Sequence, residues 1–517
     1  LIGNMVRMRI GWQWFVFSCP LLKSTCSFGI KRISSARPPW VKYDHLKERN
    51  GNEEQLLIEQ ENEEVQHQIF RRNHDKHNNK NNYNNHHPHL ENILQPPHAG
   101  CHFQPTHPGS MESGLRKHTK RFFEGWYYRI TIPQTNVSFA FIVSIEDPFP
   151  GSSLSLACHQ IMGPNDEYLV QADRDHTKLW AYPHEQSLGC IFEGDPSVRR
   201  IAGIVENFSN SSIIQSGFQY SPTRFQGTVL GHDGSYGGVL EGQGIPGTCT
   251  YDFSIQILSG YGDSQQGQKS TAGWLASYAV FEPHWQVTVA DARATGRIVW
   301  KDTTYDFVDA PFYAEKNWGG AFPTKWYWCQ CNAFTNYIDA ENSLSVTTGG
   351  GIRKLPLGQT ESLGMITVHY KGKFYEATPW LGEMDWNVSP WGNWSMTGRS
   401  TGSQHPFEVQ LKAICDVPGV KLRAPTEYDG MVYFCRDSFL ATVTLSLWEL
   451  EYDPVLKTYR RGKCILEDAT SHQAAVEIGG GPWWDDWKAS SRMKQPMRGM
   501  VRLPYRLTNL RKKRWFR

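Results

Sequence analysis

From about Pro96 onward the chain consists of short alternating apolar and polar runs that Gly, Pro, Asn and Asp interrupt. Alternation with a period of two places the apolar side chains on one face of a strand, whereas an amphipathic helix needs a period near 3.6. Residues 442–452 (TVTLSLWELEY) alternate in this way, and residues 367–378 (TVHYKGKFYEAT) predict a hairpin with residues 371–373 at its tip. Many such segments in one chain indicate barrels or sandwiches, so we predict an all-β protein.

Two aromatic segments indicate that one β unit occurs twice. Residues 126–128 (WYY) and 326–328 (WYW) each open an aromatic strand-like run, and internal similarity of this kind is the mark of a repeated architecture. We place the boundary near Ala310, which predicts two antiparallel barrels in tandem, at 96–309 and 310–487. An apolar ligand is expected inside the barrels or between them.

Composition excludes several classes of protein. The 53 Lys and Arg nearly balance the 51 Asp and Glu, so the chain lacks the basic field that non-specific nucleic-acid binding requires. No window approaches the ~18 apolar residues of a spanning helix, and we predict no transmembrane segment. The 11 cysteines are odd in number and form no Cys-x-x-Cys pair, which disfavours a disulfide framework. Cys329 and Cys331 are expected to be packing residues on one face of a strand.

Both ends of the chain differ from the part between them. Residues 1–43 carry seven Lys or Arg and no acidic residue, a composition typical of an organelle-targeting segment, although an apolar patch at 12–17 also fits a secretory signal. Residues 44–95 are rich in Gln, Asn and His and predict a disordered linker. Residues 488–517 form a basic tail, either a solvated end or an attachment to an anionic lipid surface.

Ionisable side chains gather among aromatic residues between 269 and 332. Desolvation by such neighbours raises the pKa of a carboxyl group, which is how a side chain becomes a general acid at neutral pH. For any single carboxylate the alternative is a plain ion pair, for example with Lys316. Glu124 lies in similar surroundings in the string FFEGWYY. The candidate catalytic residues are Glu282, His284, Tyr313 and Glu315.

Other catalytic motifs are missing from the sequence. The glycine runs at 349–351 and 479–481 lack the Gly-Lys-Ser/Thr ending of a phosphate loop, so tight turns or close backbone packing explain them better. No Gly-x-Ser-x-Gly, His-Glu-x-x-His or dinucleotide fingerprint occurs, which leaves serine hydrolase, zinc protease and Rossmann readings without support.

A series of unusual strings occurs in order from about His98 to Trp487. The strings are PHAGCHF (97–103), RFFEGWYYRITIP (121–133), STAGW (270–274), FEPHWQV (281–287), EKNWGGAFPTKWYWCQCN (315–332), TGGG (348–351), SPWGNW (389–394), LRAPT (422–426), CRDS (435–438) and AAVEIGGGPW (474–483). In this order and spacing they resemble the tocopherol cyclases of plants and algae. Residues 313–318 are also similar to the Tyr-x-Asp-x-x-Trp stretch of carotenoid hydratases, with Glu315 in place of Asp.

The resemblance implies a lipocalin-like double barrel and an enzyme of vitamin E biosynthesis. Such an enzyme is an intramolecular lyase of the isomerase class, which closes the chromanol ring of tocopherols from prenylated benzoquinols. The resemblance also implies a transit peptide, a chloroplast location at plastoglobules, and no cofactor or metal. It leaves open which quinol is preferred and whether the protein self-associates.

Ring closure needs a proton on the alkene, stabilisation of the tertiary cation, and a phenolic oxygen held against it. We expect Glu315, oriented by Tyr313, to donate the proton and His284 or Glu282 to accept the phenolic one, although Glu282 is an alternative donor. Indole rings stabilise cations by up to ~2 kcal/mol each when desolvated. The expected substrate-binding residues are Glu124, Trp126, Trp285, Trp318 and Trp326.

Two rival functions remain open at this level. A lipocalin-like barrel lined with aromatic side chains also suits a non-catalytic carrier of prenyl lipids. Tryptophan platforms with two carboxylates also suit a carbohydrate-active enzyme. Formation of product from pure quinol distinguishes the enzyme from the carrier.

Overall fold

The computed structural model describes the chain in thirteen stretches, and all of them belong to the compact unit His86–Arg517. The predicted targeting segment at 1–43, the linker at 44–95 and the last residues of the tail from 504 lie outside the described residues. The described stretches are 98–102, 121–149, 151–183, 185–194, 214–231, 247–263, 268–277, 283–337, 343–354, 359–389, 391–403, 405–483 and 486–503.

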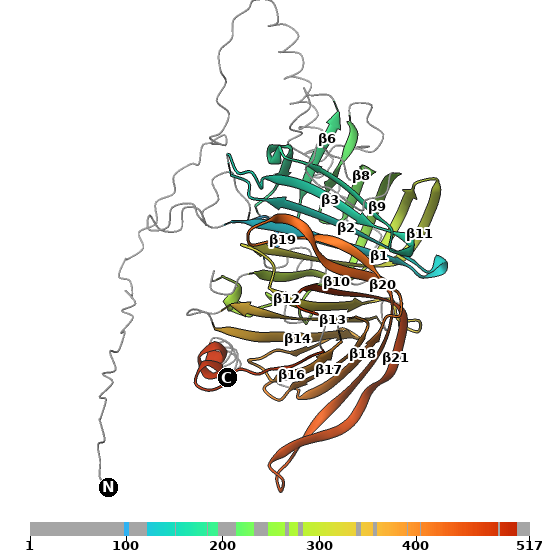
Figure 1. Ribbon diagram of the computed structural model, residues 1–517. Coiled ribbons are helices and arrows are strands. Elements are labelled where there is room, and N and C mark those ends of the chain that lie inside the picture. The colour runs from blue at the N-terminus through green and yellow to red at the C-terminus, as the bar shows by residue number, and fades with distance from the viewer. Residues whose placement is uncertain are drawn as a thin grey trace, which may run out of the picture. The chain divides into compact units, whose positions relative to one another are not determined.

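Two eleven-stranded antiparallel sheets make up nearly all of the described chain (Figure 1). In spatial order the first sheet contains β4 (Tyr168–Asp173), β3 (Leu156–Met162), β2 (Val137–Glu146), β1 (Phe123–Ile132), β11 (Thr303–Gly319), β10 (His284–Trp300), β9 (Gly247–Ser259), β8 (Arg224–Gly231), β7 (Ile214–Tyr220), β6 (Leu188–Gly194) and β5 (Leu179–Ala181). The second contains β15 (Lys373–Ala377), β14 (Thr360–Tyr370), β13 (Leu344–Lys354), β12 (Lys325–Cys331), β21 (Thr458–Gly480), β20 (Gly430–Asp453), β18 (Phe407–Ile414), β17 (Asn393–Ser400), β16 (Glu383–Val388) and β22 (Trp487–Ser491), with β19 (Val420–Thr426) paired to β20. The prediction of an all-β protein is confirmed.

Within the described stretches, helical structure is limited to short pieces. These are the 3₁₀ turns η1 (Pro133–Thr135), η2 (Pro164–Asp166), η3 (His176–Lys178) and η6 (Gly273–Ser277), and a helix at 497–503. Among the described residues no helix has the length and apolar character needed to cross a membrane.

Local sequence accounts for the strands and turns that were predicted. The expected hairpin joins β14 to β15 through Lys371 and Gly372, whose φ angles of 50° and 71° are those of a tight two-residue turn. The alternating run 442–452 lies within β20. Cys329 and Cys331 both pack into the core of the second sheet, as expected.

The two sheets repeat one arrangement around their first strands. β1, which carries the WYY segment, pairs with β2 and β11, and β12, which carries WYW, pairs with β13 and β21. β11 runs through position 310, where the sequence placed the boundary, and the chain passes to the second sheet between Gly319 and Lys325. Residues 488–491 of the predicted tail belong to β22, which pairs with β16.

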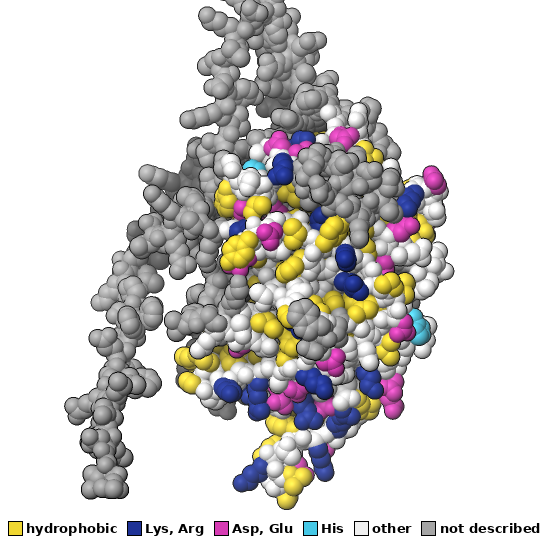
Figure 2. All heavy atoms as spheres, viewed as in Figure 1, with side chains coloured by type: hydrophobic (Ala, Val, Ile, Leu, Met, Phe, Trp, Pro, Cys, Tyr) yellow, Lys and Arg dark blue, Asp and Glu magenta, His cyan; other side chains and the backbone are white. Residues whose placement is uncertain are grey.

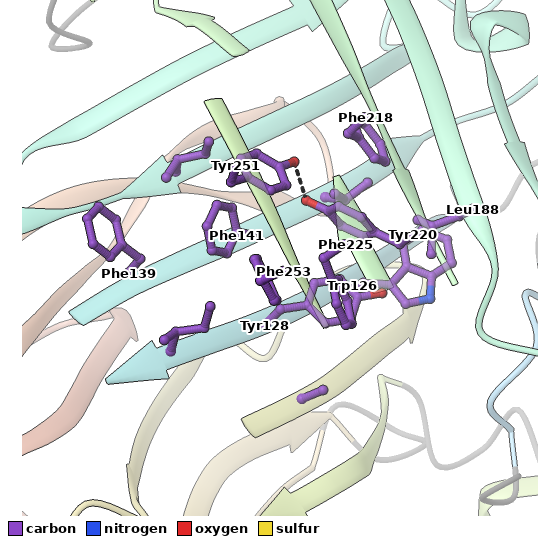
Figure 3. Close-up of a cluster of buried hydrophobic side chains, with 14 of the residues drawn as sticks. Trp126, Tyr128, Phe139, Phe141, Leu188, Phe218, Tyr220, Phe225, Tyr251 and Phe253 are labelled. Carbon is purple, nitrogen blue, oxygen red and sulfur yellow. Dashed lines mark hydrogen bonds between the residues drawn. The ribbon is translucent and has the colours of Figure 1, made fainter. Parts of the chain in front are cut away.

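Each sheet curls around a core of its own. In the first sheet, Gln171 of β4 donates to Ser216 of β7 at 2.7 Å and accepts from the backbone N–H of Leu230 at 3.1 Å. Aromatic rings fill the space inside, where the hydroxyls of Tyr220 and Tyr251 lie 2.7 Å apart (Figure 3). A third cluster of buried residues lies between the outer faces of the two sheets.

A buried arginine joins the sheets across that third cluster. Arg129 of β1 donates to the side chain of Gln330 on β12 at 2.7 Å and to the backbone carbonyl of Gln473 on β21 at 2.5 Å. These charge-assisted bonds fix the sheets against each other. At the far end of the second sheet the β20–β21 hairpin projects, and Figure 2 shows Lys, Arg, Asp and Glu side chains gathered around it.

Candidate active site

A cavity of about 290 Å³ lies between the outer faces of the two sheets. Its wall is mainly apolar and contains several aromatic rings, and two carboxyl groups, Glu315 from the first sheet and Glu477 from the second, lie on it. Small-molecule sites are typically of this kind, apolar with a few polar groups at set positions. The aromatic residues of the wall include Tyr127, Trp285, Phe322, Trp326, Tyr327 and Trp328.

Strand alternation decides which residues of β11 reach this cavity. Glu315 and Asn317 line the cavity, and Tyr313 lies in the cluster between the sheets. Ala314 and Trp318 point to the other side of the strand, into the core of the first sheet. Successive side chains on a strand point to opposite faces. The aromatic segment around Glu315 therefore faces the cavity between the sheets on one side and the core of the first sheet on the other.

Three donors hold one oxygen of the Glu315 carboxyl group. Oε2 accepts from the Tyr313 hydroxyl at 2.6 Å, from the Trp285 indole at 2.8 Å and from the Trp328 indole at 3.0 Å. Oε1 has a weak contact, with the Asn317 amide at 3.5 Å. Because Oε2 is saturated with donors, a proton on this group resides at Oε1.

Burial sets the protonation state of Glu315. Desolvation raises the pKa of this carboxyl group to about 7, although the hydrogen bonds from Tyr313, Trp285 and Trp328 favour the ionised form and oppose the rise. A substantial fraction of the group is therefore protonated at neutral pH, as a general acid requires.

Glu477 was missed by the sequence analysis. Its Oε1 accepts from the Trp326 indole at 2.5 Å, and it lies directly across the β12–β21 ladder from Trp328. Burial, with a contribution from the charge of Glu315, raises the pKa of Glu477 to about 7. The available signal was a single carboxylate within the apolar string AAVEIGGG.

Asp437 is a third carboxyl group on the same face of the second sheet. It lies directly opposite Glu477 in the β20–β21 ladder and is fully buried. Burial and the neighbouring charge of Glu477 raise the pKa of Asp437 well above its usual range. This side chain therefore loses its proton less readily than an ordinary aspartic acid.

Glycines leave room for the indole rings that hold the two carboxyl groups. A Cβ on Gly479 would lie 1.9 Å from the ring of Trp326, and one on Gly349 would lie 3.3 Å from the ring of Trp285. Both positions are inside strands. Close packing explains these two glycines, and neither a turn nor a phosphate loop is present at them. Of the two explanations that the sequence left open, tight turns or close backbone packing, the second holds here.

His284 lines the cavity but is a weak base. Its ring stacks on Trp318 at 4.9 Å, and burial, followed by the charges of His102 and His98, lowers its pKa to about 4. Trp318 in turn stacks on His102 at 4.1 Å.

Glu124 faces the core side of β1 and is paired. The Lys316 ammonium lies 2.6 Å from its Oε1, and both oxygens accept from the backbone N–H of His102. Burial alone would raise the pKa of Glu124, but Lys316 and His102 outweigh it and lower the pKa to about 2. This cluster attaches residues 98–102 to β1 and β11.

The structure thus brings together part of the predicted set. Glu315, Tyr313, Trp285, Trp326 and His284 meet at or beside the cavity. Trp126 borders it while packing into the first core, whereas Glu124 and Trp318 do not line it. Glu282 lies outside the described residues. In the described part of the chain, no three His, Cys, Asp or Glu side chains form a group that could hold a metal ion.

Comparison with known proteins finds similarity over most of the chain. A model of the family described as tocopherol cyclase-like matches residues 120–480. "Probable tocopherol cyclase, chloroplastic" of Oryza sativa subsp. japonica is 37% identical over 80% of this chain and 84% of its own length. "Tocopherol cyclase, chloroplastic" of Zea mays is 36% identical over 81% of this chain and 85% of its own. Among solved structures, a protein of Nitrosomonas europaea covers 70% of this chain and 92% of its own at 8% identity, with a TM-score of only 0.34.

Proposed function

The chain belongs to the tocopherol cyclase family, and we propose that it closes the chromanol ring of tocopherols from phytyl-benzoquinols, as an intramolecular lyase of the isomerase class. The observation that carries this proposal is the buried carboxyl group of Glu315, held by three donors beside an aromatic cavity. The reaction is an isomerisation, so it consumes no oxidant or reductant.

The proposed step is a proton transfer coupled to ring closure. The proton at Oε1 of Glu315 passes to the alkene carbon that becomes the ring CH₂, and the phenolic oxygen forms a bond to the tertiary carbon. The phenolic O–H breaks as this C–O bond forms, and a base on the protein takes that proton. A carboxylic acid is a weak donor for an alkene, so the step depends on oxygen attack at the same time within a dry, ordered cavity.

The cavity wall supports this chemistry in two ways. Indole rings of Trp285, Trp326 and Trp328 line it, and each can stabilise a developing cation by up to ~2 kcal/mol. Tyr127 lies across the β1–β11 ladder from Glu315, and its buried hydroxyl has no hydrogen-bond partner among the described residues. This hydroxyl is placed to bind a quinol oxygen.

We further propose that the protein works in plastids on the surface of lipid bodies such as plastoglobules, within vitamin E biosynthesis. Both plant relatives are named chloroplastic, and the acid-free basic segment 1–43 fits a transit peptide. Met493 and Ala272 belong to the cavity wall, and close to them in the chain lie the exposed apolar side chains of Trp274, Met497, Met500 and Leu503. Exposed apolar side chains of this kind suit contact with a lipid surface.

Conversion of a pure phytyl-benzoquinol to the chromanol by the purified protein tests this function. Binding of the quinol without conversion would instead support the carrier of prenyl lipids.

A further inference from the structure

The proposed cyclisation leaves one proton without an acceptor. Glu315 delivers a proton to the alkene, and a different group has to take the phenolic one. From the sequence, His284 or Glu282 was predicted for that role. Glu282 lies outside the described residues, and the pKa of His284 is lowered to about 4. A base with so low a pKa is a poor acceptor for a phenolic proton.

We propose that Glu477 is the base that takes the phenolic proton while Glu315 protonates the alkene. This inference rests on the cyclisation proposed above. Both carboxyl groups line the one cavity, and Trp328 connects them: its indole donates to Glu315 at 3.0 Å, and its backbone faces Glu477 across the ladder. The two groups come from different sheets and so enclose the ligand space from two sides.

Electrostatics divides the roles between the two groups. The charge of Glu315 raises the pKa of Glu477, because two carboxylates near each other in a buried site do not readily ionise together. The pair therefore holds one proton in its active form. Asp437 lies directly opposite Glu477, and burial together with the charge of Glu477 raises its pKa, which favours its neutral form.

The proton balance closes within this pair. In each turnover the O–H bond of Glu315 breaks and a C–H bond forms, while the phenolic O–H breaks and an O–H bond forms on Glu477. The proton then returns from Glu477 to Glu315, directly or through solvent, and no net proton is consumed. The apparent pKa values of such a pair belong to the pair and not to one residue.

The variant Glu477→Gln tests the assignment because an amide oxygen still accepts the hydrogen bond from Trp326. We expect ring closure to fall by ~10²- to 10⁴-fold, the usual contribution of a general base. The acid limb of the kcat/KM profile, along which the ionised base gains its proton, should disappear. Glu477→Asp should keep that limb at a reduced rate. Glu376→Gln is the matched control, because Glu376 is also a pKa-raised carboxyl group that accepts from a tyrosine, Tyr261, but it does not line the cavity.

Binding supplies a readout that does not depend on turnover. A quinol with a saturated side chain cannot cyclise, and its binding can be followed by tryptophan fluorescence. In the wild type the affinity for this quinol should fall as the pH drops and Glu477 gains a proton. The groups that face Glu477 are Glu315, Asp437, Cys435 and Trp326. In Glu477→Gln this pH dependence should be absent. A fully active Glu477→Gln enzyme that keeps the acid limb of its pH profile would refute the role of Glu477 but not the cyclisation. A wild-type protein that forms no chromanol would refute the cyclisation itself.

Discussion

Trp328 of the second sheet donates its indole N–H to Oε2 of Glu315 in the first sheet, at 3.0 Å. Trp285 of the first sheet donates to the same oxygen at 2.8 Å. The candidate acid is therefore oriented by residues of both sheets, and the packing between the sheets determines its geometry. Arg129, which also joins the two sheets, supports this arrangement from within the same interface.

Replacing Glu315 by Gln keeps the shape of the side chain and removes the acid. We expect ring closure to fall by ~10²- to 10⁴-fold while the quinol still binds. Trp318→Phe should cost much less, because Trp318 lies on the core side of β11 and stacks on His102 and His284. Steady-state kinetics together with a binding titration checks both variants. Full activity of Glu315→Gln would transfer the donor role to another carboxyl group.

Trp328→Phe should move the alkaline limb of the pH profile upward. The indole N–H stabilises the ionised form of Glu315 and lowers its pKa, so losing it raises the pKa and keeps the acid protonated to higher pH. One hydrogen bond to a charged group is worth ~1.5 kcal/mol, or roughly one pH unit. Trp394→Phe is the control, because the Trp394 indole donates to a backbone carbonyl at 3.2 Å in the core of the second sheet. A limb that stays in place or moves downward in Trp328→Phe would contradict this account of the pKa.

Gly479→Ala should disturb the site through packing. The added Cβ would lie 1.9 Å from the ring of Trp326, which bonds Glu477, and overpacking of this kind costs ~1–3 kcal/mol. We expect a lower melting temperature and reduced activity. In Gly499→Ala the new Cβ meets only the end of the Gln495 side chain, in a helix at 497–503, so stability should be unchanged or raised. Equal melting temperatures for both variants would argue against the role of Gly479.

Truncation separates the fold from the tail. Removing residues 504–517 leaves β22 and the helix at 497–503 in place, so the protein should stay folded but sediment less with anionic liposomes at low salt. Removing everything after Asp486 also deletes Trp487 from the second core and should destabilise the protein. Unchanged sedimentation after the shorter truncation would leave 504–517 as a solvated end.

Residues 1–90 should be dispensable for folding, because their composition offers little apolar surface to bury. Deleting them should leave the melting temperature of the remainder unchanged. A decrease of several degrees would show that this part of the chain contributes to the fold.

The local pattern of the sequence predicted strands and turns well, because alternation and turn residues act over a few positions. It could not predict that β11 pairs back to β1, which depends on contacts between distant segments. The faces of β11 were in principle readable: Glu315 and Trp318 are three positions apart, so on one strand they point to opposite sides. Glu477 was missed because only the packing of the two sheets brings this residue of β21 to the same cavity as Glu315.

The most direct test of the central claim is cyclisation of the quinol by the wild-type protein in deuterated water. Proton transfer from Glu315 to the alkene predicts one solvent deuterium in each chromanol, on the ring carbon next to the oxygen-bearing carbon, as read by mass spectrometry and NMR. A chromanol formed without solvent deuterium at that carbon would contradict alkene protonation by an exchangeable carboxyl group.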